Sequence, residues 1–231
     1  MIVSVHQPQY IPWIGYFHKI KSSDVFVLLD NVQYKKREFQ NRNKIRTKEG
    51  PIWLTVPVLT KGEYTQRIKD VCIDNTEHWE RKHLNSMETD YHKAKYFKEH
   101  EPFFKELYSK KWEKLSELNI AVIKYLLDYL EIGTKIYLES ELDITGESTE
   151  RIVNICKKLG GDAYLSGAGG KDYMDEKLFA DAKLGLVYQN FKHPEYPQVY
   201  EGFESHLSTV DMVFNCGKES MQLIGKQKIN S

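Results

Sequence analysis

The sequence MIVSVHQPQYIPWIGYFHKI of residues 1–20, followed by SSDVFVLLDNVQY of residues 22–34, carries the clearest indication of the fold. The apolar run 2–5 is short and rich in β-branched residues, which predicts a buried strand. A turn with two prolines then leads into a helical pattern, and the apolar run 25–29 predicts a second strand. The order strand, loop, helix, strand is typical of an open parallel α/β sheet.

Polar side chains follow both predicted strands. His6 and Gln7 come directly after the first strand, and Asp30 follows the second. Because the loops after the carboxyl ends of parallel strands form the ligand crevice, we expect these three side chains on one rim. His6 is the natural candidate for a general base, and Asp30 is a further acid–base candidate. Aromatic residues crowd the same loop, as in many ligand sites, and packing of the loop alone is the competing interpretation.

The composition indicates one large domain, or one and a half, without a strong electrostatic preference. The chain has 231 residues, 41% of them apolar, and a formal net charge of zero, so no global field favours nucleic acid or a membrane surface. Cys72, Cys156 and Cys216 are too widely spaced for a disulfide framework or a zinc site. Because no signal-peptide pattern or long apolar run occurs, we expect a cytoplasmic protein without membrane insertion, nucleic-acid partner or structural metal.

The rest of the chain predicts strands and helices around one long helical block. Residues 76–131 are helical and charged, and we expect them to form a helical insertion or subdomain packed over the crevice. The polar tail after Gly217 is expected to fray. The fold class is therefore α/β, with a mainly parallel open sheet in a single domain of residues 1–231. Strands are also expected at 53–58, 67–74, 135–142, 163–165 and 186–189, and helices at 151–159 and 175–182.

A glycine-rich segment follows the strand predicted at 163–165. It reads SGAGGKDY from Ser166 to Tyr173, and includes Gly167, Lys171 and Asp172. Its glycines allow backbone N–H groups to approach an anion, and the lysine beside them can hold a phosphate. The segment lacks the spacing of a P-loop, and a flexible strand–helix turn is the competing interpretation.

Two other segments carry side chains that suit phosphates or sugar hydroxyls. Arginine pairs bidentately with phosphate, whereas amide side chains bind sugar hydroxyls, but a solvated basic loop explains the first segment equally well. In the second segment two prolines fix the backbone, which suits either a rigid wall or a structural turn. The candidate residues are Gln33, Tyr34, Arg37, Asn41, Arg42 and Lys44 in the first segment and Tyr196 and Gln198 in the second.

The opening loop also resembles a known nucleotide-binding element. Strand, turn and the sequence from Trp13 to Tyr16 have the placement of the His-x-Gly-His element of nucleotidylyltransferases and pantothenate synthetases. In those enzymes two histidines at a helix N-terminus stabilise phosphate charge. Here Trp13 and Tyr16 stand in place of the histidines, and neither ring is a cation at neutral pH. The architecture therefore resembles the nucleotidylyltransferase-like Rossmann superfamily.

Longer motifs occur in order along nearly the whole chain. They are HQPQYIPWIGYF at 6–17, DVFVLLDNVQY at 24–34, NRN at 41–43, WLTVP at 53–57, HW at 78–79, YLSG at 164–167, KDY at 171–173, YPQ at 196–198 and LSTVDMVFNCG at 207–217. In these motifs the chain resembles the WbqC-like family. The resemblance implies a cytoplasmic enzyme of bacterial O-antigen or other surface-polysaccharide pathways, which acts on a nucleotide-linked sugar or on its amine.

We therefore hypothesise acyl or aminoacyl (glycyl-like) transfer to a nucleotide-linked amino sugar. One alternative is an ATP- and Mg²⁺-dependent nucleotidylyl- or adenylate-forming enzyme, and another is a non-catalytic sugar-nucleotide binding protein. The sequence leaves the cofactor and the oligomeric state unknown. The expected catalytic residues are His6 and Asp30, and the expected substrate-binding residues are Gln7, Tyr10, Trp13, Tyr16, Gln33, Tyr34, Arg37, Asn41, Arg42, Lys44, Ser166, Gly167, Lys171, Asp172, Tyr173, Tyr196 and Gln198.

Overall fold

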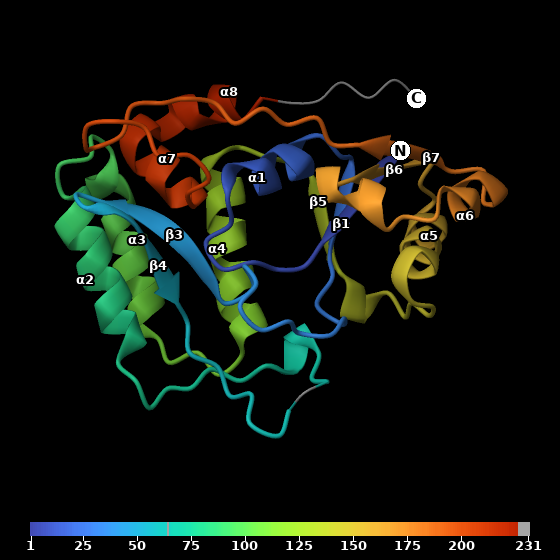
Figure 1. The fold of residues 1–231 in the computed structure, drawn as a ribbon, viewed down its shortest axis with the longest axis horizontal. Coiled ribbons are helices and arrows are strands. Elements are labelled where there is room, and N and C mark those ends of the chain that lie inside the picture. The colour runs from blue at the N-terminus through green and yellow to red at the C-terminus, as the bar shows by residue number, and fades with distance from the viewer. Residues whose placement is uncertain (64, 226–231) are drawn as a thin grey trace.

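A five-stranded parallel sheet lies at the centre of the computed structural model, which describes residues 1–63 and 65–225 (Figure 1). The strand order is β5-β2-β1-β6-β7, so along the sheet the strands come third, second, first, fourth and fifth in chain order. This is the order of doubly wound sheets, whose ligand crevice opens where the order reverses, here between β1 and β6. The predicted α/β class with a mainly parallel sheet is confirmed. The strands are β1 (Ile2–His6), β2 (Val25–Leu28), β5 (Lys135–Leu138), β6 (Ala163–Ser166) and β7 (Gly185–Tyr188).

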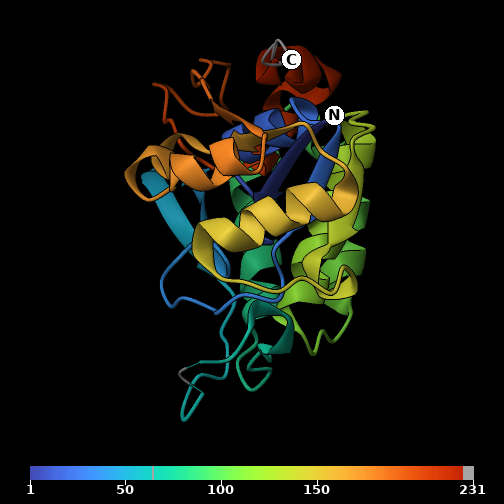
Figure 2. The same cartoon turned by 90° about the vertical axis from the view of Figure 1, so that its right-hand side faces the viewer.

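Helices cover both faces of the sheet because alternate strand residues point to opposite sides. Val3 and Val27 pack against α5 (Ser148–Leu159) and α6 (Glu176–Asp181) on one face. Phe26 and Leu28 belong to the core of the other face, which α1 (Ile14–Lys21) and α4 (Leu115–Tyr129) complete. Figure 2 shows α5, in yellow, lying over the strands. The helix predicted at 151–159 is therefore confirmed and begins three residues earlier.

The helical block predicted at 76–131 forms three helices, but it does not cover the crevice. α4 lies against the sheet, whereas α2 (Trp79–Tyr91) and α3 (Phe97–Ser109) pack on each other, and α3 also packs on α7 (Thr209–Cys216). Among the described residues, none of 76–131 lines the crevice cavity. The expectation that this block packs over the crevice is wrong, because its apolar faces are buried in the core on one side of the sheet.

A β-hairpin replaces the basic loop and the isolated strand that the sequence predicted. β3 (Arg42–Thr47) pairs antiparallel with β4 (Gly50–Thr55), so the strand expected at 53–58 begins earlier and ends before Pro57. The strand expected at 67–74 is wrong, because 68–70 forms the short 3₁₀ helix η1 (Ile68–Asp70). Within the described chain, the rest of 67–74 forms only isolated β-bridges, such as the one between Val58 and Ile73.

The chain after Gly217 is helical as far as the structure describes it. The 3₁₀ helix η4 (Gly217–Glu219) leads into α8 (Ser220–Ile224), and Ile224 is buried. α8 packs against α1, and Nζ of Lys21 donates to the carbonyl oxygen of Met221 at 2.6 Å. The expected fraying is wrong for 217–225, and residues 226–231 lie outside the described part. Within that part, no helix combines the length and the apolarity that crossing a membrane requires.

Candidate functional site

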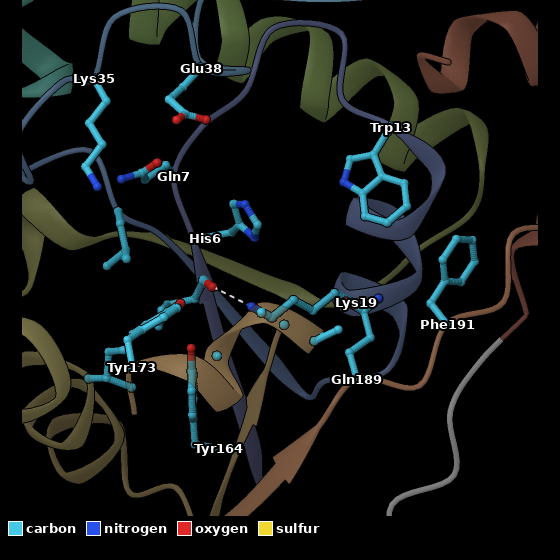
Figure 3. Close-up of a pocket in the computed structure, with 17 residues that line it drawn as sticks. His6, Gln7, Trp13, Lys19, Lys35, Glu38, Tyr164, Tyr173, Gln189 and Phe191 are labelled. Carbon is cyan, nitrogen blue, oxygen red and sulfur yellow. Dashed lines mark hydrogen bonds between the residues drawn. The ribbon is translucent and has the colours of Figure 1, made fainter. Parts of the chain in front are cut away.

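A cavity of about 550 Å³ opens at the carboxyl ends of β1 and β6, where the strand order reverses (Figure 3). Residues far apart in the sequence meet there, as expected for a doubly wound sheet. Five of the predicted site residues line it: His6, Gln7, Trp13, Gly167 and Tyr173. The remaining lining residues are Val5, Lys19, Leu29, Lys35, Glu38, Ile152, Tyr164, Ala168, Gly169, Gly170, Gln189 and Phe191.

Lys19 is the most unusual side chain of this cavity. It is only 3% exposed, and its Nζ donates a 2.8 Å hydrogen bond to the carbonyl oxygen of Val5. Burial lowers the pKa of Lys19 to about 7, because desolvation disfavours the ammonium form. The sequence did not single out Lys19, because it lies off the apolar stripe of Ile14, Phe17 and Ile20 and a regular helical pattern turns it toward solvent.

His6 is a weaker base than the sequence suggests. Burial, together with the charge of Lys19, lowers the pKa of His6 to about 3. The ring lies edge-on to Tyr16 at a centroid distance of 5.1 Å, and its Nε2 is 3.2 Å from Nε2 of Gln9. At neutral pH His6 is therefore uncharged and able to form neutral hydrogen bonds, whereas Lys19 has the pKa that suits a general base.

Gln7 is held in place by its neighbours. Its backbone carbonyl accepts from the hydroxyl of Tyr16 at 3.2 Å, so the buried Tyr16 shapes the loop from behind. Its side-chain oxygen accepts from Nε2 of Gln40 at 2.8 Å, and Oε1 of Gln40 accepts from the backbone N–H of Lys35 at 3.1 Å. This chain fixes Gln7 at the edge of the cavity.

Aromatic rings form one wall of the cavity. Trp13 and Phe191 meet edge to face with centroids 5.5 Å apart. A Cβ on Gly15 would lie 2.2 Å from the Trp13 ring, so a glycine is required where the indole packs on the helix. Gln189 joins the wall to α1, because its Nε2 donates to the carbonyl oxygen of Gly15 at 2.8 Å. Such a wall suits a sugar or base face.

The glycine-rich segment contributes backbone and Tyr173 to the opposite wall. It forms the 3₁₀ helix η3 (Ala168–Asp172), and Tyr173 is 66% exposed. A Cβ on Gly170 would meet Oγ of the buried Ser166 at 1.9 Å, so this turn can form only with glycine there. Lys171 and Asp172 are exposed and lie outside the lining, with Nζ of Lys171 over the Tyr188 ring at 5.3 Å.

Four predicted site residues are held elsewhere by buried contacts. The carboxylate of Asp30 accepts from the backbone N–H and the hydroxyl of Ser140 at 2.9 and 2.6 Å. The hydroxyl of Tyr10 lies 2.8 Å from Nδ1 of His83 in the core. The other two are Tyr34, whose pKa burial raises to about 12, and Asn41, whose side chain donates to the carbonyl oxygen of Val56 at 2.9 Å.

The predicted cationic residues lie mainly on one face of the hairpin. Cζ of Arg42 and Nζ of Lys44 lie 4.3 and 5.1 Å from the Trp53 ring centroid, and Trp53 is 40% exposed. Arg42 also donates to the backbone carbonyl of the exposed Arg37. Gln33 is exposed and forms a bridge with Arg67. These residues are a surface beside the loop that carries Lys35 and Glu38, not part of the cavity lining.

The side chains of Tyr196 and Gln198 donate hydrogen bonds to a buried carboxylate. Asp211 is fully buried and accepts from the hydroxyl of Tyr196 at 2.9 Å and from Nε2 of Gln198 at 3.0 Å. The hydroxyl of Tyr91 donates to its second oxygen at 2.6 Å. Burial raises the pKa of Asp211 although these donors act against the rise. The two predicted residues therefore hold the segment after β7 to α7, away from the cavity lining.

No metal-binding cluster is present among residues 1–63 and 65–225, since no three His, Cys, Asp or Glu side chains gather there as ligands would. The charged groups in the cavity lining are Lys19, Lys35 and Glu38. Neither Lys35 nor Glu38 was predicted; of the neighbouring residues the sequence pattern indicated Arg37, which does not line the cavity. The residues present therefore suit an organic ligand with oxygen-rich groups.

The chain matches the model of the WbqC-like protein family over residues 7–223. It is similar to the Mycobacterium tuberculosis (strain ATCC 25618 / H37Rv) protein named Uncharacterized protein Rv1507c. The two are 34% identical over 220 residues, which cover 94% of this chain and 95% of that protein. No solved structure matches the chain. The matched region contains every cavity-lining residue from Gln7 to Phe191.

Proposed function

The chain belongs to the WbqC-like protein family, and we propose that it transfers, in this cavity, an acyl or aminoacyl group to the amine of a nucleotide-linked amino sugar. The proposal assigns the reaction to the biosynthesis of bacterial O-antigen or related polysaccharide. The observation that carries it is the buried amine of Lys19, whose pKa of about 7 suits proton removal at neutral pH.

Amide formation needs a base, because the attacking amine must lose a proton. The neutral form of Lys19 accepts that proton, and burial is what makes this form abundant at pH 7. His6, which is neutral beside Lys19, helps to orient the acceptor. This proposal moves the role of base from His6 to Lys19, because the buried amine of Lys19 is held in the cavity lining by Val5 and has a pKa of about 7, whereas burial lowers the pKa of His6 to about 3.

The remaining features suit the two ends of a sugar nucleotide. Trp13, Phe191 and Tyr173 supply stacking surface for the sugar. Lys35 lines the cavity, and Arg42 and Lys44 lie on the hairpin outside the lining, so cations are available for the phosphates. An activated acyl donor then requires only positioning next to the amine.

A ligand screen tests the proposal. Melting temperatures and calorimetry are measured with UDP-, GDP-, CMP- and dTDP-sugars, amino sugars included, beside ATP with Mg²⁺. A ligand at 100 times its dissociation constant adds about 2.7 kcal/mol to the free energy of unfolding, which a melting curve resolves. Lys19→Met is expected to bind the amino-sugar nucleotide and to lose turnover. Lys158→Met, at an exposed position of α5, is the matched control.

The strand order favours a second candidate, a nucleotidylyl- or adenylate-forming enzyme, because doubly wound sheets bind nucleotides at this edge. Binding of ATP together with release of pyrophosphate supports it over acyl transfer from a preformed donor. A sugar nucleotide that binds tightly and is not turned over with any activated acyl donor contradicts both enzymatic proposals. That result indicates a sugar-nucleotide binding protein.

A further inference from the structure

We infer that the cavity offers a ligand hydrogen-bonding groups of opposite character at two residues. The side chain of Gln7 offers its two N–H donors, and the side chain of Gln189 offers its oxygen as an acceptor. The ligand atom at Gln7 is therefore a hydrogen-bond acceptor, which in acyl transfer is a carbonyl or carboxylate oxygen, and the ligand group at Gln189 is a donor such as a hydroxyl or an amine. The identity of the reacting ligand groups rests on the proposed function. The polarity itself rests on hydrogen bonds to backbone groups.

The orientation of Gln7 follows from a backbone donor. The N–H of Lys35 can only donate, so the atom of Gln40 that lies 3.1 Å from it is the oxygen. The other side-chain atom of Gln40 is then its NH₂, which donates to Oε1 of Gln7 at 2.8 Å. The NH₂ of Gln7 remains, and it has no protein partner among residues 1–63 and 65–225. It is left for a ligand.

Gln40 is a positioning residue, because it acts through Gln7 and does not line the cavity. It is only 1% exposed. Its backbone carbonyl accepts from the side chain of Asn119 on α4 at 2.8 Å. The backbone of Gln40 and both ends of its side-chain amide form hydrogen bonds. The amide therefore cannot flip without breaking buried hydrogen bonds, which are costly to lose.

Gln189 has the reverse orientation for the same kind of reason. The carbonyl oxygen of Gly15 can only accept, so the atom of Gln189 at 2.8 Å is the nitrogen. Its second N–H lies toward Nδ1 of His18 at 2.9 Å, and burial together with Lys21 lowers the pKa of His18. Both N–H groups are used, and Oε1 of Gln189 has no partner within the described chain. It can only accept.

This pattern matches the needs of acyl transfer. The amine nitrogen of the sugar attacks the carbonyl carbon of an activated ester or thioester, and a C–N bond forms while the carbonyl π pair moves to oxygen. The NH₂ of Gln7 stabilises that oxyanion, as amide donors do in acyl transfer. Lys19 takes the proton of the amine. When the carbonyl re-forms, the C–O or C–S bond breaks, and the leaving group departs with its electron pair and receives the proton from Lys19. Gln7 is thus a catalytic residue.

Side-chain amide exchange measured by NMR tests the polarity without any ligand. In the wild type, the NH₂ of Gln40 is expected to be protected from exchange with water, and that of Gln7 to exchange freely. Gln40→Glu still accepts from Lys35 but cannot donate, so the NH₂ of Gln7 turns to the new carboxylate and becomes protected. Gln222→Glu, at an exposed position of α8, leaves both signals unchanged. A protected NH₂ of Gln7 in the wild type overturns the inference, even if Gln40→Glu does not fold.

Three compounds test the ligand class. UDP-N-acetylglucosamine and UDP-glucosamine differ in the acyl carbonyl, and acetate carries a carboxylate without any nucleotide. Gln7→Glu should weaken binding of the acetylated sugar nucleotide roughly 10- to 100-fold and that of the amine far less. Acetate should shift the NH₂ signal of Gln7. No shift with acetate or with the acetylated compound overturns the carbonyl assignment. Failure of both sugar nucleotides to bind, with the acetate shift present, contradicts the proposed function and leaves the polarity intact.

Discussion

Nζ of Lys19 donates a 2.8 Å hydrogen bond to the carbonyl oxygen of Val5, in the strand that ends at the candidate site. A lysine in such a place is unusual, because its ammonium form is nearly removed from water. The hydrogen bond holds the amine in the lining of the cavity. Its chemical reactivity is therefore accessible to measurement.

Lys19 should react with amine reagents at a lower pH than an ordinary lysine. The neutral amine is the reactive form. Burial lowers the pKa of Lys19 to about 7, so half of the Lys19 side chains are neutral near pH 7. We expect pulse labelling with acetic anhydride, read by mass spectrometry, to show half-maximal labelling of Lys19 near pH 7. The exposed Lys158 is the internal reference, and identical pH profiles for the two would contradict the low pKa of Lys19.

Buried histidines should make the fold acid-sensitive. Burial lowers the pKa values of His83 and His100 to about 4, whereas an unfolded histidine titrates near 6.5. Between these values the unfolded state binds more protons, so the free energy of unfolding falls as pH falls from about 6.5 to 4. Urea unfolding at several pH values should show a shallower pH dependence for His100→Gln. The exposed His78→Gln is the control, and an unchanged slope in His100→Gln contradicts the assignment.

Gly15→Ala should displace Trp13 from the cavity wall. The added Cβ would lie 2.2 to 2.6 Å from three atoms of the indole ring, and overpacking of this kind costs about 1–3 kcal/mol. We expect a lower melting temperature and altered tryptophan fluorescence. Gly133→Ala is the matched control, because nothing lies within 4 Å of its Cβ. Equal stability and fluorescence in the two variants would mean that the indole does not pack on Gly15.

Tyr196 should matter for stability and not for ligand binding. Tyr196→Phe removes one donor from the buried carboxylate of Asp211 and should lower the free energy of unfolding by about 1.5–3 kcal/mol, as measured by urea titration. Asp211→Asn should cost more, because Tyr91, Tyr196 and Gln198 all donate to this carboxylate. Affinity for a cavity ligand should stay the same in Tyr196→Phe. A large loss of affinity with unchanged stability would instead make Tyr196 a ligand contact.

The hairpin cations should bind the phosphates of a nucleotide ligand. Arg42 and Lys44 lie over the exposed Trp53 ring, and charged hydrogen bonds to phosphate contribute about 1.5–3 kcal/mol each. The double variant Arg42→Gln/Lys44→Gln is expected to bind a sugar nucleotide with an affinity at least roughly tenfold lower, as measured by calorimetry. The difference in affinity should be smaller at high salt, which screens the charges. Lys48→Gln, exposed just beyond β3, is the control. Equal affinities in the two variants would place the phosphates elsewhere.

Local patterns were enough to predict most of the secondary structure. The two apolar runs at 2–5 and 25–29 became neighbouring parallel strands, paired Val3 to Val25, because short β-branched stretches suit a buried sheet whatever surrounds them. The hairpin was missed because residues 42–47 carry three cations, and only their pairing with 50–55 makes them a strand. The prediction of a strand at 67–74 was wrong because this segment bridges to several different partners and not to one neighbouring strand.

Consecutive residues alone were enough to predict the parallel α/β sheet and the position of the candidate site, because each strand end and the polar loop after it are neighbours in the sequence. His6 and Gln7 are at the cavity for that reason. The chemical properties of each side chain at the cavity depend on contacts that form only in the folded chain. Lys19 gains its lowered pKa from burial, and Asp30 is occupied by Ser140. Gln7 and Gln189 receive opposite polarities from partners 33 and 174 residues away, because burial and hydrogen-bond direction depend on which segments meet.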